Sequence, residues 1–333
     1  MGSSNPHSPS PAVAEAYRFC RDVARREAKN FYWSFRVLPR HKSDAMCAVY
    51  AFMRRADDIA DDESKPIAAR RAEMSAWLES WRRSRAANPG DAALTPPLPA
   101  HIGHRTKDIA DPDALVFLAL ADTQRRFNIP DQLLEELVAG TTMDLEPRTD
   151  AGPQTYPTFE DLYHYCYLVA SVVGLVTIRI FGYTDPRAEA WAEETGIAFQ
   201  LTNILRDVKE DVERGRIYIP LDLLDEFGET PAELAQLAQP NPRPITERER
   251  SMLAPLAIRA EKYYLAARKL IPLLDRDSRA AMWVLVTIYH RLLSRIADHR
   301  MEVFRTRISL TTAEKLSIFA RGAVLAAVNR LRA

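Results

Sequence analysis

The spacing of apolar residues constrains the fold of this chain most, because it follows the ~3.6-residue period of an α-helix through most of its length. We find no segment with convincing strand alternation and no internal repeat of fixed period. Glycine is scarce, with 11 in 333 residues, which disfavours a turn-rich β fold or a glycine-rich phosphate loop. The pattern therefore predicts an all-α protein. The predicted helices cover 12–29, 43–62, 66–87, 113–127, 130–145, 158–182, 186–214, 220–227, 246–274, 276–305 and 311–331.

The breaks between these helices predict loops and not a linker between domains. The stretch 88–112 is rich in proline and lacks periodicity, which predicts a mobile surface loop, and 146–157 and 228–245 predict two further loops. Residues 1–11 lack the basic and apolar regions of a signal peptide, so we expect a disordered tail there. Because no linker separates two self-contained halves, we expect a single helical domain over 12–333.

Composition and charge exclude several classes of protein. Lys and Arg number 45 and Asp and Glu number 45, and this balance disfavours a nucleic-acid-binding protein, which usually carries a basic excess. Cys20, Cys47 and Cys166 lie far apart without a CxxC pair, so we expect reduced, buried thiols and a cytoplasmic location. No run of ~18 apolar residues predicts a membrane span. The amphipathic segment 311–331 is expected to pack on the protein body, with peripheral membrane contact as the open alternative.

The first acidic motif lies in the segment RRADDIADD (54–62). Asp57 and Asp61 are four residues apart and therefore share one face of a helix. A solvated acidic face would explain such a pair. The preceding run AMCAVYAFM (45–53) is strongly apolar, however, and predicts a buried helix, where a pair of carboxylates needs cations.

The second acidic motif consists of Asn203, Asp207 and Asp211, at positions i, i+4 and i+8. Successive members drift by only about 40° around a helix, so all three line one face. A solvated stripe is again the simplest alternative. A set made only of oxygen ligands suits Mg²⁺, which takes a few carboxylates together with waters and substrate phosphates. The two motifs together indicate a site for a diphosphate ester.

Two arginines accompany these motifs. Arg54 lies one turn before Asp57, and Arg206 directly precedes Asp207. The planar guanidinium group suits phosphate oxygens, although surface ion pairs would explain either residue. A diphosphate leaves an allylic carbon readily once its charge is neutralised, and the resulting cation must be kept from water by an apolar, aromatic cavity.

At these motifs the chain resembles the squalene/phytoene synthase family of head-to-head prenyl diphosphate synthases, from about Tyr17 to Arg307. The resemblance implies one helical bundle around a central cavity, with the acidic motifs on facing helices. It implies about three Mg²⁺ ions with the substrate, bound by both acidic motifs. The segments that carry it are NFYWSFRVLP (30–39), YAFMRRADDIADD (50–62), MDL (143–145), YCYLVASVVG (165–174) and QLTNILRDVKEDVERGRIYIP (200–220).

The resemblance also implies the roles of individual residues. The metal ligands would be Asp57, Asp61, Asn203, Asp207 and Asp211. The catalytic residues would be Asp57, Asp61, Asp207, Asp211, Arg54, Arg206 and Tyr218. The substrate-binding residues would be Phe31, Phe35, Tyr50, Tyr165, Val169, Ala170, Gly174, Gln200 and Tyr289.

The implied reaction joins two identical allylic diphosphates head to head. The run VVGLVTIRIFGY (172–183) resembles the bacterial hopanoid-type synthases. We therefore expect two farnesyl diphosphates to form presqualene diphosphate, and then squalene if NADPH is used. One alternative is a phytoene synthase acting on geranylgeranyl diphosphate, or a dehydrosqualene synthase. The others are a chain-elongating synthase or terpene cyclase, and a non-catalytic relative acting as a scaffold. Prenyl diphosphates are the expected partners, and the oligomeric state stays open.

Overall fold

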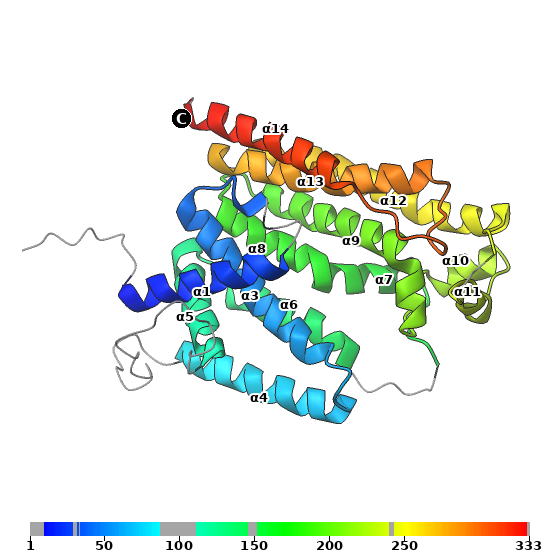
Figure 1. The fold of residues 1–333 in the computed structure, drawn as a ribbon, viewed down its shortest axis with the longest axis horizontal. Coiled ribbons are helices and arrows are strands. Elements are labelled where there is room, and N and C mark those ends of the chain that lie inside the picture. The colour runs from blue at the N-terminus through cyan, green and yellow to red at the C-terminus, as the bar shows by residue number, and fades with distance from the viewer. Residues whose placement is uncertain are drawn as a thin grey trace, which may run out of the picture. The chain divides into compact units, whose positions relative to one another are not determined.

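The structure is a computed structural model that describes residues 10–28, 32, 34–86, 111–145, 152–239 and 243–331. Helices dominate these residues, and the only β-structure among them is two isolated bridges, Gln154 to Arg216 and Tyr183 to Leu274. The prediction of an all-α fold is confirmed. The chain divides into two compact units, Met1–Glu146 and Pro147–Ala333, and each is described by itself (Figure 1). The expected single domain stays a prediction.

The first unit is built around α3 (Arg40–Ala60), which packs on its four neighbours. Phe52 of α3 lies 4.9 Å from the ring of Trp77 and 5.0 Å from the ring of Trp81, and Trp77 lies 5.5 Å from Phe117. Such aromatic contacts add to the free energy gained by burial. They fix the helix that carries the first acidic motif. The other elements are α1 (Pro11–Glu27), α4 (Ile67–Ala86), α5 (Pro112–Phe127), α6 (Asp131–Thr142) and the 3₁₀ turn η1 (Met143–Leu145).

The second unit is built around α9 (Arg187–Glu213), the helix that carries the second acidic motif. It contacts α7 (Phe159–Cys166), the π-helical turn η2 (Tyr167–Ser171), α8 (Val172–Phe181), α11 (Pro231–Leu237), α12 (Glu247–Leu270) and α13 (Arg276–Asp298). The remaining elements are α10 (Leu221–Glu226), η3 (Ile271–Leu273) and α14 (Thr312–Leu331), and α14 lies along α13 (Figure 1).

The turn η2 and α9 meet at an unusually close backbone approach. A Cβ atom added to Gly196 would lie 2.5 Å from the Cα atom of Ser171 and 2.7 Å from its nitrogen. The Ser171 hydroxyl donates a hydrogen bond of 2.7 Å to the carbonyl of Glu193. The contact therefore depends on glycine in α9 opposite the π turn, a helix irregularity that is frequent at functional sites.

The structure changes two of the predicted boundaries. The predicted loop 228–245 is wrong in part, because it contains α11, whose N-cap Thr230 forms a capping box with Glu233. The predicted helix 276–305 is shorter than expected, because α13 ends at Asp298. Beyond Asp298, Arg300 and Met301 have φ values of 53° and 57°. A right-handed α-helix cannot continue through residues with positive φ.

The cysteines agree with the prediction, whereas the N-terminal boundary and one apolar helix differ from it. Cys20, Cys47 and Cys166 are buried free thiols, as predicted. The helix α1 begins at Pro11, inside the expected tail, and the expected loop 88–112 lies almost entirely outside the described residues. Among the described residues, Phe159–Phe181 is long and apolar enough to cross a membrane by length and composition alone, which the sequence analysis did not expect. Half of its most apolar stretch is buried within the structure, as in a core helix.

Candidate active site

The second acidic motif occupies one side of α9, as the spacing predicted. Leu201, Ile204, Leu205 and Val208 are buried on the other sides of the same turns. Burial of these apolar residues fixes the rotation of the helix, because a turn about its axis would expose them to water. Asn203, Asp207 and Asp211 are left partly exposed along the remaining face.

Asp207 is held by two arginines. The Nε atom of Arg206 lies 2.8 Å from Asp207 Oδ1, and a second ion pair joins the same two side chains. An Nη atom of Arg307, from the segment after α13, also lies 2.8 Å from Asp207 Oδ1. Arg307 was not among the predicted site residues. No periodic pattern singles it out, and only the folded chain brings it to α9.

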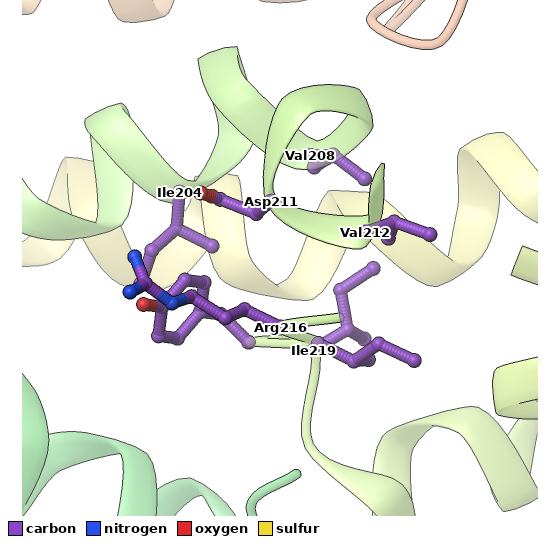
Figure 2. Close-up of a pocket in the computed structure, with 8 residues that line it drawn as sticks. Ile204, Val208, Asp211, Val212, Arg216 and Ile219 are labelled. Carbon is purple, nitrogen blue, oxygen red and sulfur yellow. The ribbon is translucent and has the colours of Figure 1, made fainter. Parts of the chain in front are cut away.

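The surroundings of Asp211 disfavour the ionised carboxylate. Burial raises the pKa of this carboxyl to about 7, with a further rise from the negative charge of Asp207, while the positive charge of Arg216 opposes the shift. Asp211 and Arg216 extend to the same side of a small cavity, past Ile204 (Figure 2). The volume of this cavity is about 10 Å³, roughly the room that one water molecule needs. A second positive charge near Asp211 would lower its pKa again.

Asn203 has a buried acceptor without a partner. Its amide nitrogen lies 3.4 Å from Gln200 Oε1, and an Asn203 hydrogen bond also reaches the Tyr289 side chain. The side-chain oxygen of Asn203 is buried and accepts no hydrogen bond within the described part of the chain. An orphaned oxygen one turn from Asp207 and two turns from Asp211 fits a hard divalent cation such as Mg²⁺.

The described residues contain no cluster of three or more His, Cys, Asp and Glu side chains arranged as a complete metal site. Mg²⁺ in proteins usually keeps several water and phosphate ligands in addition to one or two carboxylates. The acidic face of α9 supplies two carboxylates and one amide oxygen. It therefore fits an ion that arrives with a diphosphate, and does not form a closed protein cage.

A tyrosine cluster adjoins the acidic face, because Tyr218 lines the same small cavity as Asp211 and Arg216. The hydroxyls of Tyr165 and Tyr218 lie 2.9 Å apart, both side chains are buried, and their rings stack at 4.9 Å. Tyr156 packs on both, at 5.4 Å from Tyr165 and 5.7 Å from Tyr218, and accepts a hydrogen bond of 2.8 Å from Gln154. Tyr165 and Tyr218 were predicted as site residues from distant positions in the sequence. Tyr156 and Gln154 were not, and no sequence pattern marks them.

The predicted cavity-lining residues lie on two elements. Val169 and Ala170 are half-buried in η2, and Gly174 follows in α8, where an added Cβ would lie 3.0 Å from the carbonyl oxygen of Ala192. Tyr289 of α13 is buried, stacks on Phe199 at 4.5 Å, and has a pKa raised by burial. Their contact with substrate stays a prediction.

The first acidic motif differs from the expectation in one respect. The apolar part of α3 is buried, but Asp57 and Asp61 are exposed, so the predicted burial of this pair is wrong. The helix ends at Ala60 and Asp61 is its C-cap, with its N–H donating to the Asp57 carbonyl at 2.8 Å. The chain leaves its core at this point, and the acidic end of the helix is solvated.

Arg54 makes an ion pair with Asp58, at 2.6 Å, as the alternative interpretation of this residue allowed. Its predicted contact with phosphate oxygens stays a prediction. Its Nε atom is buried without a hydrogen-bond partner among the described residues. Tyr50, one turn earlier, is half-buried, and burial raises its pKa to about 12. Phe35 is buried, and Phe31 lies outside the described residues.

Comparison with known proteins agrees with these features. The sequence profile of the squalene/phytoene synthase family matches residues 24–314. The chain belongs to this family. Its members are prenyltransferases that condense prenyl diphosphates head to head, and the chain is therefore a prenyltransferase of this kind.

Two relatives show the extent of the match. The chain is 34% identical to the phytoene synthase of Mycobacterium bovis over 311 residues, covering 92% of this chain and 90% of the relative. It is 34% identical to the 15-cis-phytoene synthase of Synechococcus elongatus over 330 residues, covering 93% and 94% of the two chains.

Solved structures share the fold. A dehydrosqualene synthase in complex with ligand has a TM-score of 0.73 and 25% identity, with 95% of this chain and 98% of that chain covered. The squalene synthase HpnC of Alicyclobacillus acidocaldarius has a TM-score of 0.69 and 25% identity, with 86% and 95% covered. The family resemblance inferred from the motifs is confirmed.

Proposed function

We propose that this chain is a Mg²⁺-dependent synthase that condenses two geranylgeranyl diphosphates head to head to phytoene. The observation that carries the proposal is the face of α9, where the orphaned oxygen of Asn203 and two carboxylates stand beside the guanidinium groups of Arg206 and Arg307. Acidic and basic groups in one place suit a ligand that is both metal-bound and anionic.

We assign metal binding to the side chains with oxygen ligands and phosphate binding to the arginines. Asn203, Asp207 and Asp211 would hold Mg²⁺, and Mg²⁺ when bound would neutralise the leaving diphosphate. Arg206 and Arg307 would bind phosphate oxygens through their planar donor groups. Each substrate loses one diphosphate, a carbon–carbon bond that becomes a double bond forms between the two C1 atoms, and two protons leave in all.

The paired hydroxyls of Tyr165 and Tyr218 would hold or accept a proton during this sequence. Either oxygen can act as the donor of their 2.9 Å hydrogen bond, so a proton can pass along the pair without a change in the positions of the rings. Their burial keeps bulk water away from a reactive cation.

The named relatives support the C20 substrate, because two that match over most of their length are phytoene synthases. A second candidate is the condensation of two farnesyl diphosphates to presqualene diphosphate, dehydrosqualene or, with NADPH, squalene. The two structural neighbours named above and the run 172–183 favour it. Because of the named relatives, we propose the C20 substrate first, although the run 172–183 led us to expect the C15 substrate.

The test is product analysis by mass spectrometry. Purified protein is incubated with MgCl₂ and either geranylgeranyl or farnesyl diphosphate, with and without NADPH. We expect a C40 hydrocarbon from geranylgeranyl diphosphate, no product after chelation of the metal, and recovery when Mg²⁺ is restored. A C30 product would support the second candidate. In a further incubation with isopentenyl diphosphate added, consumption of that compound would contradict both.

Asp207→Asn tests the role of the acidic face. We expect the rate to fall by about 100-fold or more, because the change removes a charged ligand while keeping the shape of the side chain. Asp222→Asn is the matched control, since Asp222 is an exposed carboxylate of α10 in the same unit. Equal activity of both variants, with unchanged circular dichroism, would rule out the proposed role.

A further inference from the structure

Positive charge gathers at the C-terminal end of this chain. Residues 247–333, from the start of α12 onward, hold 17 Lys and Arg against 8 Asp and Glu, a formal net charge of +9, whereas the whole chain has a net charge of zero. The three helices of this region pack together, with α13 in contact with both α12 and α14 (Figure 1). A surface built from them attracts anions.

Exposed apolar side chains gather on the same helices. Six large apolar side chains are exposed among the described residues, and five of them belong to α12 and α14. Isolated exposed apolar residues are common, but a concentration of this kind marks a contact surface. The five are Ile258 (56% exposed), Leu265 (54%), Leu316 (47%), Val324 (63%) and Leu325 (40%).

A groove of about 550 Å³ runs between α12 and α13. Arg268 lines it from α12, and Arg291 and Arg295 line it from α13, together with the apolar side chains of Trp283 and Val286. No hydrogen bond or ion pair engages Arg268 within the part of the chain that the structure describes. Arginines and apolar side chains in one groove suit an anionic group attached to a hydrocarbon.

The acidic groups around the groove have partners of their own. Glu261 lies 2.9 Å from His290. Glu314 accepts hydrogen bonds from Thr311 and pairs with Arg295, so its distance of 3.7 Å to Arg291 is a looser contact. Asp298 is the one carboxylate that lines the groove directly. The arginines Arg268 and Arg291 therefore keep donors for an external anion.

The helix geometry places charge and apolar side chains on one face of α12. Ile258, Leu265 and Arg268 are at positions i, i+7 and i+10, which share a face of α12. In α14 the buried residues Ile318, Gly322 and Ala326 form a separate stripe. Gly322 faces Val284 of α13, because an added Cβ would lie 2.2 Å from a Val284 methyl carbon. Leu316 and Val324 lie on the side of α14 opposite this buried stripe, whereas Leu325 lies at its edge.

We infer that the surface formed by α12, α13 and α14 binds an anionic phospholipid membrane. The arginines of the groove contact headgroup phosphates, and the exposed leucine, isoleucine and valine side chains enter the interface between headgroups and acyl chains. Charge and apolar residues act together, as stable peripheral binding requires. The inference concerns a surface and does not depend on the proposed reaction.

The experiment is co-sedimentation of the full chain with vesicles. One set contains phosphatidylcholine with about 30 mol % phosphatidylglycerol and the other phosphatidylcholine alone. We expect binding to the anionic vesicles, weakened at high salt. Arg268→Glu is expected to lower the partition coefficient about 5-fold or more, because one basic residue near such a surface contributes about that factor. Leu265→Ser together with Val324→Ser is expected to lower it by a similar factor.

Two exposed residues of α4 in the first unit provide matched controls. Arg83→Glu reverses an exposed charge, and Ile67→Ser removes an exposed apolar side chain, which is 38% exposed. We expect both to bind as the unchanged chain does. Absence of binding to the anionic vesicles would overturn the inference, as would equal loss in the controls. A shift in oligomeric state with Leu265→Ser and Val324→Ser, seen by size-exclusion chromatography, would instead make this surface an interface between copies.

Discussion

Glu249 shows how a single buried charge is stabilised in this fold. Its side chain is 2% exposed at the start of α12, where it accepts hydrogen bonds of 2.9 and 2.6 Å from Arg243 and completes the capping box of Thr246. The hydrogen bonds from Arg243, and then those from Thr246, lower the pKa of this carboxyl from 4.5 to about 2. Because the folded state lowers the pKa, ionisation of Glu249 stabilises the fold above the unfolded pKa. That stabilisation disappears as pH falls from 4.5 toward 2.

We predict that Glu249→Gln lowers the free energy of unfolding at pH 7 by about 2 kcal/mol. The difference from the unchanged chain should shrink as pH falls below 4.5, and urea unfolding at several pH values measures it. Glu233→Gln is the control, because Glu233 closes a similar capping box at the start of α11 and is only half-buried. A constant difference between pH 7 and pH 3 would contradict the prediction.

Site residues could be predicted where a local sequence pattern, such as helical spacing, identifies them. Asn203, Asp207 and Asp211 follow helical spacing, and the structure places them on one face. Arg307 reaches Asp207 from another part of the chain, and its place depends on how the segment after α13 returns to α9. The predicted burial of Asp57 and Asp61 was wrong because an apolar run determines where a helix is buried and not where it ends.

At the scale of elements, the packing of α9 on η2 depends on one missing side chain. We predict that Gly196→Ala lowers the free energy of unfolding by about 1 to 3 kcal/mol, because the new methyl group meets backbone atoms that cannot rotate away. Gly174→Ala should cost about 1 kcal/mol or less, since its nearest contact is 3.0 Å and alanine favours the helix. Chemical denaturation compares the two, and equal stability of Gly196→Ala and the unchanged chain would refute this account.

Most helices were predicted within a few residues, because apolar periodicity and core burial coincide in α1, α3, α9 and α12. The irregular parts were not. The π turn η2 leaves no mark on periodicity over five residues, and α11 was assigned to a loop although Thr230 and Glu233 carry a capping-box signal. A seven-residue helix is too short for periodicity to distinguish from a loop.

At the scale of the whole molecule, the two acidic motifs belong to different compact units, and the family resemblance implies that both bind the metal ions of one reaction. We predict that Asp57→Asn and Asp207→Asn each abolish most of the activity, and that the double variant is no slower than the slower single variant. Residues that serve one step give strongly non-additive losses. The rates come from single-turnover assays with mass-spectrometric detection. Losses that multiply would indicate that the motifs act in separate steps.

The double salt bridge of Asp207 has a consequence for the order of binding. Both guanidinium groups now neutralise the carboxylate that a metal ion would use, so a cation arriving alone competes with them. A diphosphate bound here as proposed would offer these arginines a new partner and would release the carboxylate. Binding of anion and cation is then a pair of linked equilibria, in which each raises the affinity for the other by the same factor. The enzyme without substrate would therefore have a low affinity for Mg²⁺, and a bound diphosphate would raise that affinity.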